Sequence, residues 1–319
     1  MEYKYKMKPL FEERMKLLLP DEKDFNNFSE IIHKEPPISI RCNTLKISPE
    51  RLKKKLEDKG WKIQVPFAEY KEIMIIQSEL QPGGLGKSIE HLLGYYYVQE
   101  ISSMLSILAL KPQPHESLLD LCASPGSKTT QAAAMMQNSG FILANDKDLG
   151  RIIILNSNLE RMSVTNQIVT KREGENLCNQ LNKQEMKFDK ILLDAPCSGE
   201  GTCRSSPKTF LMWNPGMIKK LSRTQKRLAS SVMKLLKPGG ELLYSTCTHA
   251  PEENEEVVQM LIDNFPLEIK EINLPLKTRP GLTEWQGQSF SQEMKKTCRI
   301  YPQDNDTEGF FLAKMRLKK

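Results

Sequence analysis

The sequence predicts a Rossmann-like α/β domain, with a doubly wound and mostly parallel sheet, over residues 87–319 and a small α+β module over residues 1–86. Three observations favour this division. From about residue 95 onward, short apolar runs alternate with segments of helical periodicity. The runs are continuous in apolar character, which is typical of strands buried on both faces of a parallel sheet. The stretch QPGGLG at 81–86 is a natural linker between the two parts.

The larger part is expected to contain helices over 98–110, 129–137, 151–162, 216–236 and 251–265, and strands over 117–123, 141–148, 188–197 and 241–248. Proline and glycine mark several boundaries. Lys111-Pro112 ends the first helix, Lys237-Pro-Gly-Gly ends the fourth, and Pro251 begins the fifth. Four glutamates between positions 252 and 256 suit the positive N-terminal end of that last helix. Ligands of such a fold bind at the carboxyl ends of the strands.

The first 86 residues predict strands over 38–46, 61–67 and 69–76, and a helix over 48–60 with Ser48 as its N-cap and Gly60 as its stop signal. The helix carries a group of basic residues: Arg51, Lys53, Lys54, Lys55 and Lys59. These side chains could contact phosphates.

A second basic stretch, residues 201–240, holds nine Lys or Arg residues and no Asp or Glu. Most charge runs are solvated helix faces. A run that is free of acid over this length favours contact with nucleic acid.

The composition describes a globular protein of a reducing compartment. Apolar residues make up 39% of the chain and charged residues 27%, and the first residues lack the apolar run of a signal peptide or membrane anchor. The seven cysteines show no Cys-x-x-Cys spacing, and the four histidines show no ligand spacing. We therefore expect a cytoplasmic monomer with neither a disulfide framework nor a metal site.

The segment DLCASPGSKTT at 120–130 follows an expected strand and predicts a nucleotide-like ligand. A phosphate loop requires Gly-x4-Gly-Lys, but here Ser127 separates Gly126 from Lys128. The segment also lacks the Gly-x-Gly-x-x-Gly pattern of a dinucleotide site. Asp146 nevertheless lies twenty residues beyond Gly126, the spacing of an acid that binds ribose hydroxyls.

S-adenosylmethionine fits this combination, because it has a ribose and an adenine but no phosphate. Asp120 or Asp194 would bind its ammonium group, and the backbone of residues 122–128 would hold the remainder of the molecule.

Two cysteines stand at the ends of expected strands, in DAPCSGEG at 194–201 and STCT at 245–248. Carbon 5 of a pyrimidine is a poor nucleophile. A thiolate that adds to carbon 6 creates a carbanion at carbon 5, which attacks the methyl sulfonium; loss of the carbon 5 proton then expels the sulfur. Asp194 would stabilise charge near ring atom N3, and Lys128 would favour the thiolate. A free cysteine is commonly a small packed hydrophobe, but two at successive strand ends argue against that interpretation.

The motifs VQEISSM, DLCASPGSKTT, ANDKD, DAPCSGEG and STCT resemble, in this order, those of the RsmB/NOP-type (Sun family) RNA 5-methylcytosine methyltransferases. The resemblance extends over roughly residues 38–319 and implies a class I methyltransferase fold. It further implies that Cys247 is the nucleophile and that Cys197 assists release of the product. Asp146 would bind the cofactor ribose. S-adenosylmethionine would lie against the loop of Cys122, Ala123, Ser124, Pro125, Gly126, Ser127 and Lys128.

The sequence departs from the family pattern at two positions. Ser127 replaces a glycine of the cofactor loop, and Glu173 replaces the aspartate expected beside the adenine. The resemblance also places a group of polar residues near the RNA or the cofactor, although structural roles are equally open for them: Arg41, Glu100, Ser103 and Arg204.

We expect structural roles for His249 and for Trp61, Trp213 and Trp285. The expected activity is methylation of carbon 5 of cytosine in structured RNA, with capture of the substrate by the N-terminal module and the basic stretch. The compact layout favours tRNA over rRNA. Two alternatives remain open. A non-catalytic RNA-binding or ribosome-assembly factor would not need Cys197, Cys247 or Asp194, and a small-molecule methyltransferase would not need the basic stretch.

Overall fold

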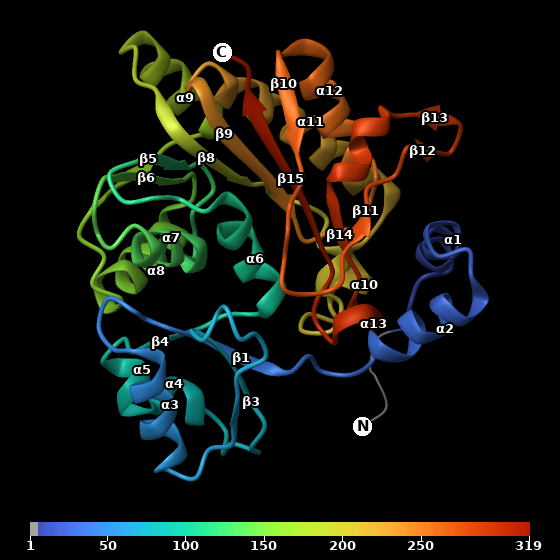
Figure 1. Ribbon diagram of the computed structural model, residues 1–319. Helices are drawn as coiled ribbons and strands as arrows, with labels where there is room; N and C mark the ends of the chain where they lie inside the picture. The colour runs from blue at the N-terminus through green and yellow to red at the C-terminus, as the bar shows by residue number, and fades with distance from the viewer. Residues whose placement is uncertain (1–5) are drawn as a thin grey trace.

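The computed structural model describes residues 6–319, so residues 1–5 of the predicted N-terminal module lie outside the described part. A mixed sheet with strand order β11-β14-β15-β9-β8-β5-β6-β7 forms the centre of the molecule, and β10 pairs with β15 (Figure 1). Its parallel strands are β5 (Ser117–Asp120), β6 (Phe141–Asp146), β7 (Gln167–Lys171), β8 (Phe188–Asp194) and β9 (Leu236–Thr246). The antiparallel additions are β10 (Leu267–Lys270), β11 (Arg279–Pro280), β14 (Cys298–Ile300) and β15 (Phe310–Leu317). The predicted doubly wound, mostly parallel fold is confirmed.

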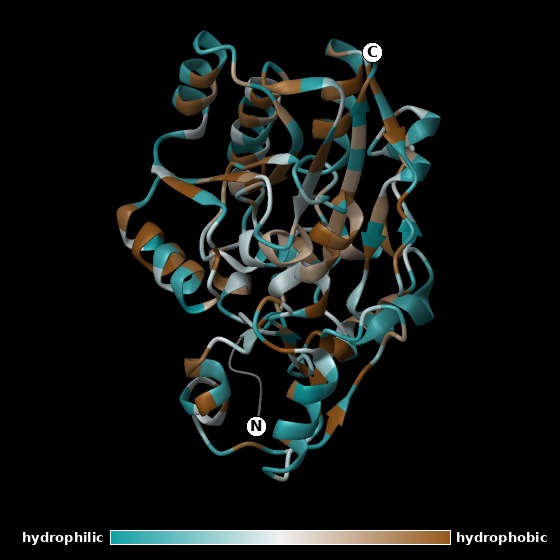
Figure 2. Cartoon of the chain, turned by 60° about the vertical axis from the view of Figure 1, so that its left-hand side comes forward, coloured by the Kyte–Doolittle hydropathy of each residue, from teal (hydrophilic) through white to brown (hydrophobic). Residues whose placement is uncertain are grey.

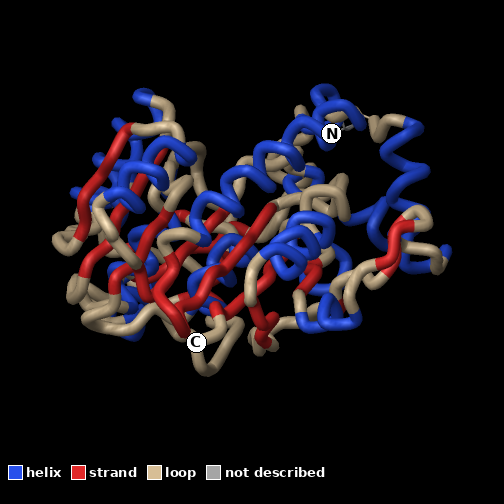
Figure 3. The backbone as a smooth tube through the Cα atoms, turned by 90° about the horizontal axis from the view of Figure 1, so that it is seen from above, coloured by secondary structure: helices blue, strands red, loops and turns tan. Residues whose placement is uncertain are grey.

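Helices pack against both faces of this sheet (Figure 3). Alternate residues of each buried strand point to opposite faces. Accordingly, Leu118, Ile142 and Leu192 join the core that holds α6 (Ile101–Leu110), α7 (Ser127–Met135) and α8 (Leu149–Arg161). Their neighbours Leu119, Leu143 and Leu193 join the core that holds α9 (Gly174–Lys183), α11 (Pro215–Met233) and α12 (Glu255–Asn264).

A small antiparallel sheet, in the order β2-β3-β1-β4, lies below the large one in Figure 1. It consists of β1 (Ile38–Cys42), β2 (Ile63–Gln64), β3 (Ile73–Ile76) and β4 (Tyr96–Val98), with α3 (Pro49–Glu57), α4 (Gly84–Lys87) and α5 (Ile89–Leu92). Because β4 pairs with β1, this sheet includes residues on both sides of position 86. By contrast, α1 (Pro9–Leu18) and α2 (Glu22–Ile31) pack on the core of the large sheet, where the rings of Phe11 and Trp213 meet edge to face.

Three predicted boundaries were wrong. Val98 ends β4, and the following helix begins only at Ile101, capped by Glu100. The Lys237-Pro-Gly-Gly segment lies inside β9, at a register shift against β8, and is not a connection after a helix. Glu252 and Glu253 precede α12 in a turn, so they do not occupy its first turn.

Short elements complete the chain: η1 (Glu200–Thr202), α10 (Thr209–Met212), β12 (Glu284–Trp285), β13 (Gln288–Ser289), η2 (Gln292–Lys296) and α13 (Pro302–Asn305). Hydrophobic and hydrophilic residues alternate along the helices, as Figure 2 shows. Within residues 6–319, no helix is both long enough and apolar enough to cross a membrane.

Candidate active site

A cavity of about 320 Å³ lies where β5, β6, β8 and β9 end. Both cysteines of the predicted pair line it, although they are fifty residues apart in the chain. The cavity is thus on the edge of the sheet where a doubly wound fold binds its ligand. Other predicted site residues in its wall are Cys122, Ser124, Asp146, Glu173 and Asp194.

The sulfur atoms of Cys197 and Cys247 are 3.3 Å apart. Backbone hydrogen bonds hold the two loops together: the amide of Ala195 donates to the Ser245 carbonyl, and the amide of Gly201 donates to the Cys247 carbonyl. The hydroxyls of Ser198 and Thr248 add a contact of 2.8 Å. The hydrogen bond with Cys247, together with burial, raises the pKa of the Cys197 thiol well above its usual value. Cys197 is therefore a neutral thiol at physiological pH.

Lys128 and Asp194 form an ion pair of 2.8 Å beside the cysteines. The hydroxyl of Ser245 donates to Asp194 over 2.7 Å, and Lys128 donates to the Ser103 hydroxyl over 2.9 Å. Burial opposes the charge on Lys128, but Asp194 outweighs it and holds the pKa of Lys128 above its usual value. The ammonium group is thus a permanent positive charge at the edge of the site.

The other end of the cavity fits an adenosyl group. Asp146 is buried, and its Oδ2 atom makes no hydrogen bond within residues 6–319, although Arg151 lies 3.5 Å away. This oxygen can accept a ribose hydroxyl. Glu173 and Gly174 line the cavity further on. A Cβ atom at Gly174 would lie 2.7 Å from Leu228, so a glycine keeps this wall open.

Only part of the predicted cofactor loop reaches the cavity wall. Cys122 and Ser124 line it, whereas Pro125 is exposed and Ala123 is buried behind the wall. Gly126 has φ of +102°, and a Cβ atom there would lie 2.9 Å from Leu155. It therefore allows the tight turn into α7.

Asp120, the alternative partner for the cofactor ammonium, is buried and accepts a hydrogen bond from Thr129 over 2.7 Å. Burial raises its pKa to about 7. Asp120 is absent from the cavity wall, whereas Asp194 is part of it.

The remaining candidates have mainly structural contacts. Arg41 is buried and donates to the Ser127 carbonyl, which supports the cofactor loop from behind. Arg204 donates to the carbonyls of Lys34, Glu35 and Thr307 and so joins distant parts of the chain.

His249 is buried and stacks on Tyr301, and burial lowers its pKa to about 3. Trp213 and Trp285 are buried, and Trp61 packs against the core of the small module. The structural roles expected for these four residues are confirmed.

Arg172, Thr224 and Arg227 also line the cavity but were not predicted. Arg172 follows the end of β7, a strand that is too exposed to form an apolar run. The only signal for Arg172 in the sequence was therefore its position directly after this strand. Thr224 and Arg227 reach the cavity from the middle of α11, and no local pattern distinguishes them.

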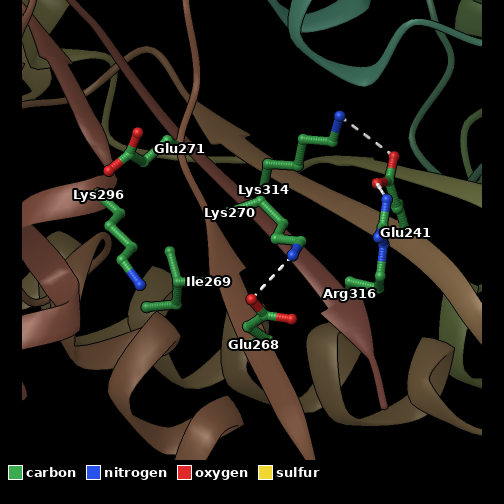
Figure 4. A pocket seen from close by; sticks show the side chains of 8 residues that line it. All are labelled: Glu241, Glu268, Ile269, Lys270, Glu271, Lys296, Lys314 and Arg316. Carbon is green, nitrogen blue, oxygen red and sulfur yellow. Dashed lines mark hydrogen bonds and ion pairs between the residues drawn. The ribbon is translucent and has the colours of Figure 1, made fainter. Parts of the chain in front are cut away.

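A second hollow is lined by strands β9, β10 and β15 and by η2 (Figure 4). Most of its charged residues form ion pairs: Lys314 and Arg316 with Glu241, Lys270 with Glu268, and Lys296 with Glu293 outside the hollow. None of the predicted site residues lines the hollow, so it is not the candidate catalytic site. Within residues 6–319, no cluster of His, Cys, Asp and Glu side chains could hold a metal ion.

Comparison with known proteins shows the family to which the chain belongs. The family of the 16S rRNA methyltransferases RsmB/F matches residues 107–316, and the N-terminal domain of 16S rRNA methyltransferase RsmF matches residues 7–101. The chain belongs to the RsmB/F family. It is thus an S-adenosylmethionine-dependent RNA cytosine-5 methyltransferase by family.

Relatives within the RsmB/F family differ in substrate. The tRNA (cytosine(49)-C(5))-methyltransferase of Pyrococcus abyssi is 43% identical, over 92% of this chain and 92% of its own length. The ribosomal RNA small subunit methyltransferase F of Vibrio parahaemolyticus is 37% identical over 96% of this chain, which spans only 62% of that relative.

Two solved structures from Pyrococcus horikoshii share the fold. A methyltransferase homolog protein is 38% identical with a TM-score of 0.81, covering 93% of this chain and 91% of its own. NSun6 with SFG is 25% identical with a TM-score of 0.85, and the match covers 99% of this chain and 100% of the NSun6 chain.

Proposed function

We propose that this chain methylates carbon 5 of a cytosine in tRNA, with Cys247 as the nucleophile and Cys197 as the thiol that assists product release. The observation that carries the proposal is the contact of 3.3 Å between the two sulfurs, in a cavity that Asp194 also lines. S-adenosylmethionine supplies an electrophilic methyl group when it is bound, and Asp146, Glu173 and the loop from Cys122 would hold it.

The sulfur of Cys247 forms a bond to carbon 6, and the electron pair of the ring double bond moves to carbon 5. The positive charge of Lys128 stabilises the attacking thiolate. As charge builds on the ring, N3 takes up a proton from water, which it returns on release, and Asp194, oriented by Lys128 and Ser245, accepts a hydrogen bond from that N–H group and stabilises the adduct. Carbon 5, now electron-rich, takes the methyl group.

Release requires loss of the carbon 5 proton, return of that electron pair to the ring, and breakage of the bond from carbon 6 to sulfur. The neutral Cys197 thiol lies against the departing sulfur and can donate its proton to it, and the thiolate that remains on Cys197 can then take up the carbon 5 proton. This step gives the second cysteine a role that a binding protein would not need.

The RNA would reach the site along exposed basic residues. On α11 these are Lys219, Lys220, Arg223 and Arg227, and Lys234 follows at its C-terminal end; Arg227 also lines the cavity. On α3, Arg51, Lys54 and Lys55 are exposed while Leu52 and Leu56 face the core. Positive side chains of this kind bind the phosphates of RNA without recognising its base sequence.

The double substitution Lys220→Gln and Arg223→Gln should weaken tRNA binding. Each lost phosphate contact is expected to reduce the slope of log K against log salt by about 1. Fluorescence anisotropy over a range of sodium chloride concentrations measures this slope. Lys270→Gln on β10, away from the proposed path, is the control. An unchanged slope in the double variant would mean that these residues of α11 do not contact the RNA phosphates.

The choice of tRNA rests on the Pyrococcus abyssi relative, which this chain matches nearly end to end. Tritiated methyl transfer to separate tRNA and rRNA pools, followed by bisulfite sequencing, tests it. We expect label in tRNA at a discrete cytosine, and position 49 is the first to inspect. Label in rRNA alone would mean that rRNA, and not tRNA, is the substrate. No label in either pool, with cofactor binding confirmed by calorimetry, would favour the non-catalytic assembly factor.

A further inference from the structure

Glu253 is a buried carboxylate that the proposed mechanism does not use. It lies in the turn before α12 with an exposed fraction of 0%. One carboxylate oxygen accepts two hydrogen bonds, from the Ser198 amide over 3.0 Å and from the Gln225 side chain over 2.7 Å. Within the described residues no ion pair reaches it, and burial raises its pKa to about 7. Burying a carboxylate without a cation is costly, so a purely packing role is a weak explanation.

Gln225 completes an arrangement around Cys197. This side chain is also fully buried, on α11, and its amide nitrogen donates a second hydrogen bond to the Pro196 carbonyl over 2.9 Å. The two side chains therefore hold the peptide groups on either side of Cys197. They come from two different elements, α11 and the turn before α12, which fixes the loop relative to the sheet.

We infer that Glu253 and Gln225 are positioning residues that hold Cys197 against Cys247 for release of the product. The inference rests on the release role proposed for Cys197. The nucleophile has a support of its own, because Thr246, the residue before it, is the last residue of β9. Disturbing Glu253 or Gln225 should therefore impair release more than attack, and the covalent intermediate should accumulate.

The test uses Glu253→Met, which removes the acceptor of both hydrogen bonds, and Gln225→Met, which removes both donated hydrogen bonds. Each variant is incubated with tRNA and S-adenosylmethionine. Turnover is measured by tritium transfer, and covalent RNA–protein adduct by a denaturing gel. We expect turnover to fall about 10- to 100-fold, as for a misplaced catalytic group, while the adduct increases. Glu256→Gln is the matched control, since Glu256 pairs with Lys226 over 3.0 Å at the surface, and it should leave both quantities unchanged.

A parallel loss of adduct and turnover would indicate a merely structural role and would overturn the inference, as would variants that behave like the control. Should Glu253→Met fail to fold, Gln225→Met alone decides the question. Cys197→Ala, run alongside, separates the two claims. If Cys197→Ala accumulates adduct and the positioning variants do not, the release role of Cys197 stands and only the positioning inference fails. If Cys197→Ala accumulates none, the release role fails, and the inference falls with it.

Discussion

Cys247→Ala should abolish methyl transfer to RNA and leave no covalent RNA–protein adduct. Without this sulfur, no bond to carbon 6 forms, and carbon 5 stays a poor nucleophile. Loss of a covalent nucleophile costs at least about 10⁴-fold in rate. Tritium transfer and a denaturing gel measure the two quantities. Cys197 should not substitute, because burial still raises the pKa of its thiol in this variant.

Cys178→Ala is the control for loss of a sulfur. Cys178 lies on the buried face of α9 and is absent from the cavity wall, so its variant should remain active. Adduct formed by Cys247→Ala but not by Cys197→Ala would reverse the roles of the two cysteines.

Asp194→Asn should lower the rate of methyl transfer by about 10²- to 10³-fold, the effect of removing one preorganised group from a charge-stabilising site. The substitution removes the carboxylate that would accept from the cytosine ring, and it leaves Lys128 without its partner at 2.8 Å. Single-turnover methyl transfer with saturating cofactor measures the chemical step. Asp263→Asn, on the exposed face of α12, is the control.

Calorimetry distinguishes the two roles suggested for Asp194. A slow variant that binds S-adenosylmethionine normally would support the role at the cytosine ring. A rate that recovers fully at high cofactor concentration would instead assign Asp194 to the cofactor ammonium and contradict the proposed mechanism.

The parallel half of the sheet was predictable because its central strands are buried on both faces and are therefore apolar runs. The ends of such strands converge, so Cys197 and Cys247 could be expected in one place before any contact was known. The edge strand β7 gives no such signal, because it is half-exposed. The antiparallel strands β14 and β15 were not expected either, although both are largely buried inside the sheet.

Contacts between distant segments were also out of reach. Nothing local indicates that α1 and α2 pack on the large sheet. Glu253 looked like one of several acids at a helix start, because its partners Gln225 and Ser198 lie 28 and 55 residues away. Their meeting depends on the packing of α11 against the strand ends.

The most direct test of the account is to identify the cysteine that bonds to the RNA. The unmodified enzyme is incubated with S-adenosylmethionine and tRNA containing 5-fluorocytosine, whose fluorine cannot leave as a proton does, so the adduct persists. Protease and nuclease digestion followed by mass spectrometry then locates the linked peptide. We expect a nucleotide attached to Cys247. Attachment to Cys197 would contradict the proposed role of Cys247 as the nucleophile.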